Sequence, residues 1–332
     1  MPDITRRGAI AAAAITAMTL LAGPGTAQTA ATDWPTGPVR VIVGFPAGSS
    51  PDTLARLITE PLAERLGQPV VVENKPGAGG VIGVQSMLTG TDGHTFATTI
   101  NGPLTTSQRL VKDLSYDPAT DIAPVALIAT SALVLGVNAA SPAQDLAGFV
   151  ELAKSAPGDL TYGSVGQGSG AHLTAELFNA AAGIEMLHVP FTSYAEVTTS
   201  IVGNEIDAGF MAPSAALPQV QAGTMRLLGI TSAEPSPLAP DVPVIAGQAG
   251  LPADFKAELW NAFIAPSGTD PAVIERLNTE LNAILQDEAV VEKLLAIGWQ
   301  AQPGTPEDLT ARIEADTAMW GAVIDRVEAA GN

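Results

Sequence analysis

The stretch that most constrains the fold is residues 39–67, which read V-R-V-I-V-G-F-P-A-G-S-S-P-D-T-L-A-R-L-I-T-E-P-L-A-E-R-L-G. Its first five residues are nearly all apolar and β-branched, which is typical of a strand buried on both faces. Small and turn-forming residues follow, and Ser50 with Pro51 suits an N-cap and a first helical residue. Apolar residues then recur at helical spacing until Gly67 ends the helix. We therefore expect a strand, a loop of small residues, and a helix whose free N–H groups and dipole can hold an anion.

The rest of the chain alternates short apolar runs with helical patterns, which indicates an α/β architecture. Further strands are expected at 70–73, 95–100, 125–129, 133–137, 160–164, 186–190, 206–211, 227–231 and 260–265. Several of them end in small polar turns, and ligands of open α/β sheets bind at the carboxyl ends of strands.

The length predicts two domains, because roughly 300 residues are too many for one ordinary core. We expect 31–130 to form the first part of one lobe, 131–231 a second lobe, and 232–332 the remainder of the first. The chain would then pass between the lobes twice, the second time through the proline-rich stretch 235–243.

The beginning of the chain resembles an export signal. Arg6 and Arg7 precede the apolar run 9–22, and small residues follow, so we expect a cleaved signal over residues 1–30. The paired arginines leave both the general and the twin-arginine export routes open, and cleavage could follow Ala27 or Ala30. An uncleaved N-terminal anchor is the alternative.

Composition excludes some partners. The formal net charge of −19 argues against binding to nucleic acid or to anionic membrane surfaces. It does not identify a substrate, because acidic surfaces also keep secreted proteins soluble. The chain has no cysteine, so stability must rest on burial rather than on disulfides.

Features that suggest catalysis have simpler interpretations. Gly166-x-Gly168-x-x-Ala171 formally fits a dinucleotide fingerprint, but an anion-binding loop explains it without a cofactor. Ser164 and Ser169 lack the flanking glycines of a nucleophile elbow.

The three histidines, His94, His172 and His188, have no metal-ligand spacing. We expect His172 to bond locally near a helix start and His188 to be a buried strand residue with a satisfied ring nitrogen. We therefore predict neither an enzyme nor a metal or cofactor site, and we expect Asp52 to orient the first loop.

Specific motifs carry a family resemblance. They begin with Trp34-Pro35 and P-V-R-V-I-V-G-F-P-A-G followed by Asp52, and continue with L-G-Q-P-V-V-V-E-N-K-P-G-A-G-G at 66–80. Later matches, in order, are Tyr116-Asp117-Pro118, 164–173, His188-Val189-Pro190-Phe191, Pro213-Ser214-Ala215, Gly223 with Arg226, 238–243 and 265–269. The chain thereby resembles the substrate-binding proteins of tripartite tricarboxylate transporters, the Bug family of periplasmic receptors.

The resemblance implies a two-lobed periplasmic-binding-protein fold of type II, with a central ligand cleft and two crossovers. It implies a periplasmic protein that captures a small carboxylate, such as a di- or tricarboxylate or an aromatic acid, by lobe closure. Partners would be the membrane permease subunits of a tripartite transporter or, alternatively, a sensor kinase without transport. We expect a monomer, and the rival from another class is a secreted α/β hydrolase.

The resemblance also indicates two loops that grip the carboxylate. These are Phe45, Ala47, Gly48 and Ser49 in the first lobe, and Ser164, Gly166, Gln167, Gly168 and Ser169 in the second. Ser193 and Glu196 have the spacing of a capping box, and we expect Thr192, Ser193 and Tyr194 to face the same cleft. Thr99 and Asn101 are expected to complete it from the first lobe.

This chain departs from the family pattern at three places. Gly48-Ser49 replaces two glycines, Thr192-Ser193 replaces a lysine–glycine pair, and Met211-Ala212 replaces an aspartate before the Pro-Ser-Ala turn. We therefore expect Met211 to line an apolar end of the cleft. A pocket lined by hydroxyls and closed by an apolar wall favours an apolar-bodied carboxylate over citrate, because uncompensated polar groups are costly to bury.

Overall fold

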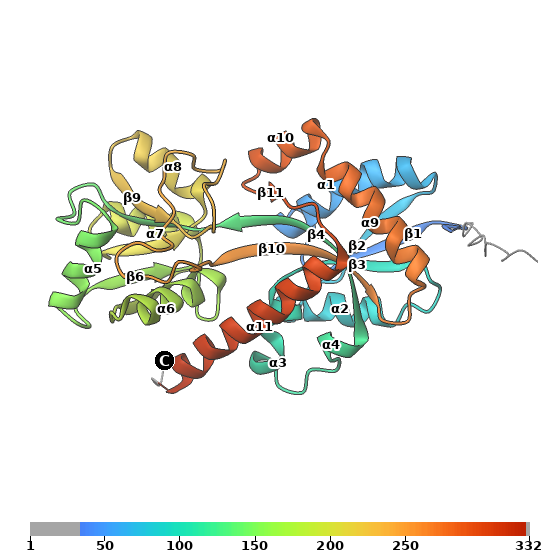
Figure 1. Cartoon of the computed structure of the whole chain (residues 1–332), viewed down its shortest axis with the longest axis horizontal. Helices are drawn as coiled ribbons and strands as arrows, with labels where there is room; N and C mark the ends of the chain where they lie inside the picture. The colour runs from blue at the N-terminus through green and yellow to red at the C-terminus, as the bar shows by residue number, and fades with distance from the viewer. Residues whose placement is uncertain (1–33, 330–332) are drawn as a thin grey trace, which may run out of the picture. The chain divides into compact units, whose positions relative to one another are not determined.

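Two β-sheets organise residues 34–329, the part of the chain that this computed structural model describes (Figure 1). The first sheet has six strands in the order β11-β4-β10-β3-β1-β2. Its strands are β1 (Val39–Val43), β2 (Val70–Asn74), β3 (Thr95–Ile100), β4 (Ile122–Ala132), β10 (Glu258–Pro266) and β11 (Gln300–Ala301). Strands β1, β2 and β3 run parallel, so their carboxyl ends meet at one edge, whereas β10 runs antiparallel to β3.

Helices cover both faces of this sheet, as the continuous apolar strands require. One face packs against α1 (Ser50–Leu66), α9 (Pro271–Leu285) and α10 (Glu288–Ala296). The other packs against α2 (Val81–Leu88) and α11 (Pro306–Ala329). Short helices η1 (Ala78–Gly80), η2 (Gly102–Leu104), α3 (Ser107–Leu110) and α4 (Pro118–Asp121) lie in the connections.

The second sheet has five strands in the order β7-β6-β8-β5-β9. They are β5 (Val134–Asn138), β6 (Thr161–Ser164), β7 (Leu187–Pro190), β8 (Ala208–Met211) and β9 (Met225–Ile230). Helices α5 (Leu146–Ser155) and α6 (Gly170–Ala182) cover one face, and α7 (Tyr194–Val202) and α8 (Pro213–Gln221) cover the other.

The chain passes between the sheets twice, once where β4 continues into β5 and once at β10. Hydrogen bonds tie the two passages together. The Thr231 backbone N–H donates to the Leu133 carbonyl, and the Thr231 Oγ1 accepts from the Leu133 N–H, both at 2.9 Å. The Ala257 N–H donates to the Thr231 carbonyl at 3.0 Å. These bonds join the two crossover segments where they pass between the lobes.

The second passage comes later than the proline-rich stretch in which we expected it. After β9 the chain stays on the second sheet, where Val244 forms a bridge with Ile230. Ile245, Leu251 and Phe255 then pack in the core of that sheet, and only β10 returns to the first. The prolines at 235–243 interrupt the sequence pattern of strands and helices, which is why we expected the crossing there. The apolar side chains that follow pack on the second sheet and keep this segment on the second lobe.

Helix α11 makes a further contact between the lobes, lying beside α6 (Figure 1). Trp320, Val323, Ile324 and Val327 of α11 form one apolar cluster with Leu173 of α6. No helix within residues 34–329 has the length and hydropathy that a membrane crossing requires. The expected export signal at 1–30 lies outside the described residues.

Candidate functional site

The loop between β1 and α1 differs from expectation at its last residue. The N-cap is Ser49, with extended backbone angles (φ −69°, ψ 162°), and Ser50 is already helical. The Ser49 side chain makes no capping bond, and its Oγ is buried with no hydrogen-bond partner among the described residues. The helix therefore begins with an unused hydroxyl and free N–H groups at its positive end.

Asp52 fixes the conformation of this loop. Its Oδ2 accepts the Gly48 N–H at 2.8 Å, and its Oδ1 accepts from the Asn74 Nδ2 at 2.8 Å. Arg56, one helical turn on, pairs with the same carboxylate at 3.0 Å. Burial raises the pKa of Asp52, but the hydrogen bonds from Arg56, Asn74 and Gly48 outweigh it and hold this pKa below its ordinary value. The expectation that Asp52 orients the loop is confirmed.

The loops that follow β1, β2 and β3 are packed against one another. A Cβ on Gly44 would lie 2.5 Å from the Gly80 carbonyl oxygen, so the two backbones can approach only because Gly44 has no side chain. A Cβ on Gly80 would meet the Phe45 ring at 2.9 Å and the Pro103 ring at 3.1 Å. Gly80 thus lies against both the first loop and the turn that contains Asn101 and Pro103.

The second loop, 164–169, leads from β6 into α6, and side chains of α6 and β7 form hydrogen bonds with it. Ser169 caps the helix, because its Oγ accepts the His172 N–H at 3.2 Å. The His172 Nδ1 accepts the Gly168 N–H at 3.1 Å, and the Ser164 Oγ lies 2.7 Å from the His188 Nε2. His172 therefore bonds near the helix start as expected, and a ring nitrogen of His188 is satisfied as expected, but His188 is half-buried rather than buried.

A cavity of about 360 Å³ lies between the lobes. From the first lobe, Gly79, Asn101 and Thr106 line it, and from the second, Gly168, Ser169 and Leu173. Apolar surface comes from Leu110, Leu259 and Trp320, and the Trp320 Nε1 is buried without a partner among the described residues. The cavity therefore has an apolar wall beside polar side chains and glycine backbone.

Two polar side chains that we did not anticipate lie at the same edge of the first sheet. Thr98 is near the end of β3, and Asn261 of β10 pairs with Ile100, the last residue of β3. The two side chains share one face of the sheet, the face that α1 covers. They are buried, and the Thr98 Oγ1 and both amide atoms of Asn261 lack partners among the described residues.

Such groups are costly to bury unless something completes them. The Ser49 Oγ, at the N-cap of α1, is a further buried oxygen without a partner among the described residues. The sequence could have indicated Asn261, because it is a polar residue within an otherwise apolar strand, W-N-A-F at 260–263.

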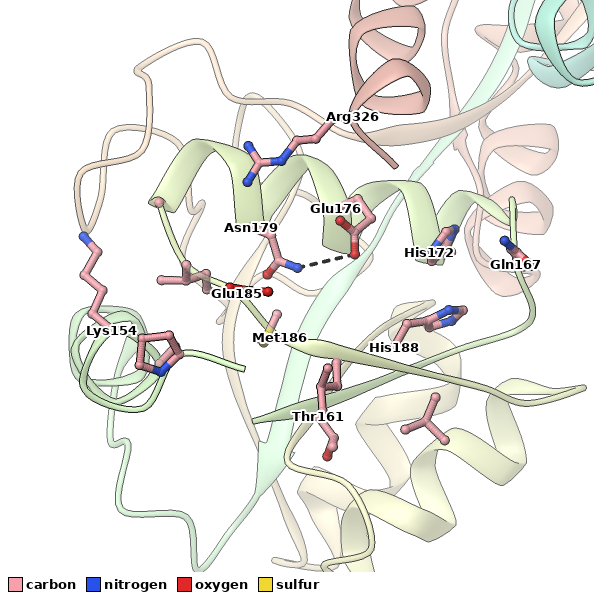
Figure 2. Close-up of a pocket in the computed structure, with 16 residues that line it drawn as sticks. Lys154, Thr161, Gln167, His172, Glu176, Asn179, Glu185, Met186, His188 and Arg326 are labelled. Atoms are coloured by element: carbon pink, nitrogen blue, oxygen red, sulfur yellow. Dashed lines mark hydrogen bonds between the residues drawn. The ribbon is translucent and has the colours of Figure 1, made fainter. Parts of the chain in front are cut away.

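The structure distributes the expected site residues over several places. Asn101, Gly168 and Ser169 line the inter-lobe cavity, and Ala47 and Gly48 are exposed on the first loop. Thr99 and Ser164 are buried, and the Met211 side chain is fully buried in the core of the second sheet, away from any open surface. Gln167 lines a different cavity, behind the loop (Figure 2).

Thr192, Ser193 and Tyr194 lie at the start of α7. Ser193 caps the helix by accepting the Glu196 N–H, whereas the Glu196 carboxylate returns to the Thr192 N–H at 2.8 Å, one residue earlier than in a standard capping box. Tyr194 packs on the cores of both faces of the second sheet.

Within residues 34–329, no group of three or more His, Cys, Asp or Glu side chains could hold a metal ion. The Ser164–His188 pair resembles a nucleophile and its base, yet Ser164 is completely buried and its Oγ also contacts Gly166. A substrate could not reach that oxygen without displacing the loop.

Comparison with known proteins finds one family and several solved structures that the chain resembles. The sequence profile of the family described as "Tripartite tricarboxylate transporter family receptor" matches residues 54–329. Protein BugT of Bordetella pertussis is 33% identical over 306 residues, which cover 92% of each chain. Rpa4515 of R. palustris, solved with adipate, has 33% identity and a TM-score of 0.70, covering 88% of this chain and 97% of its own. MatC of Rhodopseudomonas palustris, solved with malate, has 29% identity and a TM-score of 0.67, with 87% and 99% covered.

Proposed function

The chain belongs to the tripartite tricarboxylate transporter family of receptors, and on that premise we propose that it captures a small carboxylate between its two lobes in the periplasm and delivers it to the permease of such a transporter. The observation that carries the proposal is the inter-lobe cavity, which the loop before α6 lines together with the turns after β2 and β3 and with Trp320, whose Nε1 has no partner among the described residues. The loop before α1 lies against the turn after β2, through Gly44 and Gly80. Both loops precede the positive end of a helix, and both expose a glycine of positive φ, Gly48 and Gly168.

We assign the carboxylate to these donors and to the Ser49 hydroxyl. A carboxylate has about four lone-pair directions, and N–H or O–H groups that fill them form charge-assisted bonds of about 1.5–3 kcal/mol each. Within residues 34–329, no lysine or arginine lines the inter-lobe cavity. Local dipoles must therefore offset the repulsion from the net charge of −19.

The body of the ligand is apolar in this proposal. Leu173, Leu259 and Trp320 provide a wall that leaves the polar groups of a compact tricarboxylate unpaired. A short aliphatic dicarboxylate suits it better, with one carboxylate on the loops and the other toward Thr98, Asn261 or the Trp320 N–H. Adipate and malate, which the two structural relatives hold, are the first probes to use.

Binding is coupled to lobe closure because the ligand contacts both lobes only when they are closed. It shifts the equilibrium by the difference between its affinities for the closed and open forms, and a membrane partner recognises the closed surface. A sensor kinase in place of a permease remains the alternative partner, and the binding chemistry is the same for both.

A thermal-shift screen of the purified mature chain tests the proposal. The panel contains adipate, malate, citrate, benzoate, amino acids and sugars. A compound at about 100 times its Kd adds about 2.7 kcal/mol to the free energy of unfolding and raises Tm. We expect dicarboxylates to raise Tm and to be recovered unchanged; a rise with sugars alone, or turnover of the bound compound, would contradict the proposal.

The chain offers a matched pair of variants for this screen. Gly168→Val adds a side chain to the second loop, and Gly158→Val adds one before the opposite end of β6. Both glycines have similar positive φ, 74° and 77°, and both have open space around the added Cβ. Backbone strain should therefore be alike, and only Gly168→Val should abolish the carboxylate-dependent rise in Tm.

A further inference from the structure

Two histidines lie directly behind the second ligand loop, on the side away from the inter-lobe cavity. His172 comes from α6 and His188 from β7, and Figure 2 shows them beside each other, with Gln167 of the loop nearby. Their ring centroids are 4.2 Å apart, and the Tyr162 ring of β6 stacks on the His188 ring at 5.0 Å.

Each histidine is bonded to the loop rather than to a solvent-facing group. The His172 Nδ1 accepts the Gly168 N–H, which requires a lone pair on that nitrogen and therefore a neutral ring protonated at Nε2. The His188 Nε2 is paired with the Ser164 Oγ, which in turn contacts both the N–H and the carbonyl of Gly166. Gly168, held by His172, lines the inter-lobe cavity on its other side.

Protons can reach the pair from solvent. A second cavity of about 1010 Å³ opens behind the loop, between α5, α6 and β7, and both histidines line it (Figure 2). The loop therefore separates this rear cavity from the inter-lobe cavity. A change on one side of the loop can be transmitted to the other through a single backbone N–H group.

The charged groups around the pair come from every neighbouring element. Glu176 of α6 accepts the Tyr162 hydroxyl at 2.6 Å, and Lys154 of α5, Glu185 before β7 and Arg326 of α11 line the rear cavity. Burial lowers the pKa of His172, and burial together with the charge of His172 lowers that of His188 to about 4, while Glu176 acts in the opposite direction. Both rings are thus neutral at neutral pH.

We propose that His172 and His188 are positioning residues that make ligand capture proton-sensitive: protonation of His172 places a hydrogen on Nδ1, breaks its bond to the Gly168 N–H and releases the second ligand loop. The proposal rests on the function proposed above. The chemistry is acid–base, with no covalent change, and the two rings are too close for both to take up a proton at the same mild pH.

The inference also follows from reciprocity. If release of the loop accompanies protonation of His172, then a bound carboxylate must lower the pKa of His172 by the same free energy by which protonation weakens binding. Removing the titratable group while keeping the acceptor should therefore remove the coupling and retain the binding.

The conservative variant for this test is His172→Asn. The Asn Oδ1 is attached to Cγ, as is the histidine Nδ1, so it can accept the Gly168 N–H and cannot be protonated in this pH range. His188→Gln is the corresponding variant for the second ring. His94→Asn is the matched control, because His94 bonds to Thr36 and Asp92 on the first lobe.

The first measurement is the Kd of adipate from about pH 8 to about pH 4.5. Adipate itself takes up protons at the acid end, so the informative quantity is the difference between wild type and His172→Asn. We expect the wild-type Kd to rise about tenfold more than that of His172→Asn, and His94→Asn to follow the wild type. Parallel profiles for wild type and His172→Asn would overturn the proposal.

The second measurement needs no ligand. In an NMR titration, the Gly168 amide resonance should move with the same midpoint as the His172 ring in the wild type, and should not move in His172→Asn. A Gly168 amide that ignores His172 protonation would overturn the proposal even if adipate binds. Failure of all carboxylates to bind at about pH 8, with the Gly168 coupling present, would contradict the proposed function instead.

Discussion

The Asp52 Oδ2 accepts the Gly48 N–H at 2.8 Å, and this bond fixes the loop between β1 and α1 to the helix that follows it. The same carboxylate holds Asn74 of β2 and pairs with Arg56, so one buried side chain joins the loop, the helix and the neighbouring strand. A carboxylate beside an anion site would repel the ligand if it faced it. Here its lone pairs are occupied by the loop and by Asn74.

Asp52→Ala should therefore destabilise the protein and weaken carboxylate binding together. It leaves the Gly48 N–H and the Asn74 amide without their acceptor, at a cost of about 1.5–3 kcal/mol in the free energy of unfolding. Urea denaturation measures that loss, and the adipate-dependent rise in Tm measures the loss of binding. Glu60→Ala removes an exposed carboxylate from the same helix and should change neither quantity; equal effects of the two variants would show that net charge, not the loop, is responsible.

Gly44→Ala should push apart the loops that follow β1 and β2. The new Cβ would lie 2.5 Å from the Gly80 carbonyl oxygen and 2.7 Å from its Cα, and backbone cannot move aside as a side-chain tip can. We expect a loss of about 1–3 kcal/mol in stability together with weaker adipate binding. Gly37→Ala, where nothing lies within 4 Å of the added Cβ, is the control for the loss of a glycine. A Gly44→Ala protein with wild-type Tm would show that the two loops do not depend on each other.

Much of the fold follows from local sequence patterns. The β1 and β3 strands have the predicted bounds, and α1 ends at Leu66 with Gly67 in the left-handed conformation that permits the stop. The two-lobed α/β fold and the family are likewise as the motifs indicate. Each of these is encoded within a few neighbouring residues.

What the sequence did not reveal depends on contacts between distant segments. Thr98, rather than Thr99, shares a face with Asn261, because the register of β10 against β3 decides which side chain faces α1. Trp320 reaches the inter-lobe cavity only because α11 crosses to α6. The return passage at β10 was displaced for the same reason, since packing on the second sheet holds residues 244–255 there.

The stability of the free protein should fall as the pH drops from about 6.5 to about 4. Above this range His172 and His188 are neutral in both the folded and the unfolded chain. Within this range the unfolded chain binds protons, whereas the two rings of the folded chain stay neutral. The free energy of unfolding therefore decreases as the pH falls, until His188 is also protonated in the folded protein.

Carboxylates contribute to the same curve, so the measurement is the difference in Tm between wild type and the double variant His172→Asn/His188→Gln. Because only the wild type has the two histidine rings, its Tm should fall more steeply, and the Tm of the variant minus that of the wild type should be larger at about pH 5 than at about pH 7.5. Identical slopes would mean that the pair carries no titration cost.

Asn261→Leu should separate binding from stability. Asn261 is completely buried, and neither its oxygen nor its nitrogen has a hydrogen-bond partner among the described residues. A leucine, with the same branching and the same number of side-chain heavy atoms, removes that unsatisfied amide, so the free energy of unfolding should stay constant or rise by about 1–3 kcal/mol. If the amide binds the ligand, adipate binding should nevertheless weaken.

The control is Asn278→Leu, because the Asn278 Nδ2 donates to the Val125 and Gly304 carbonyls at 2.8 and 2.9 Å. That variant should lose about 1–3 kcal/mol of stability and keep its affinity for adipate. Urea denaturation and calorimetric titration measure the two quantities, and an Asn261→Leu protein that is less stable but binds adipate as the wild type does would assign Asn261 to the core rather than to the site.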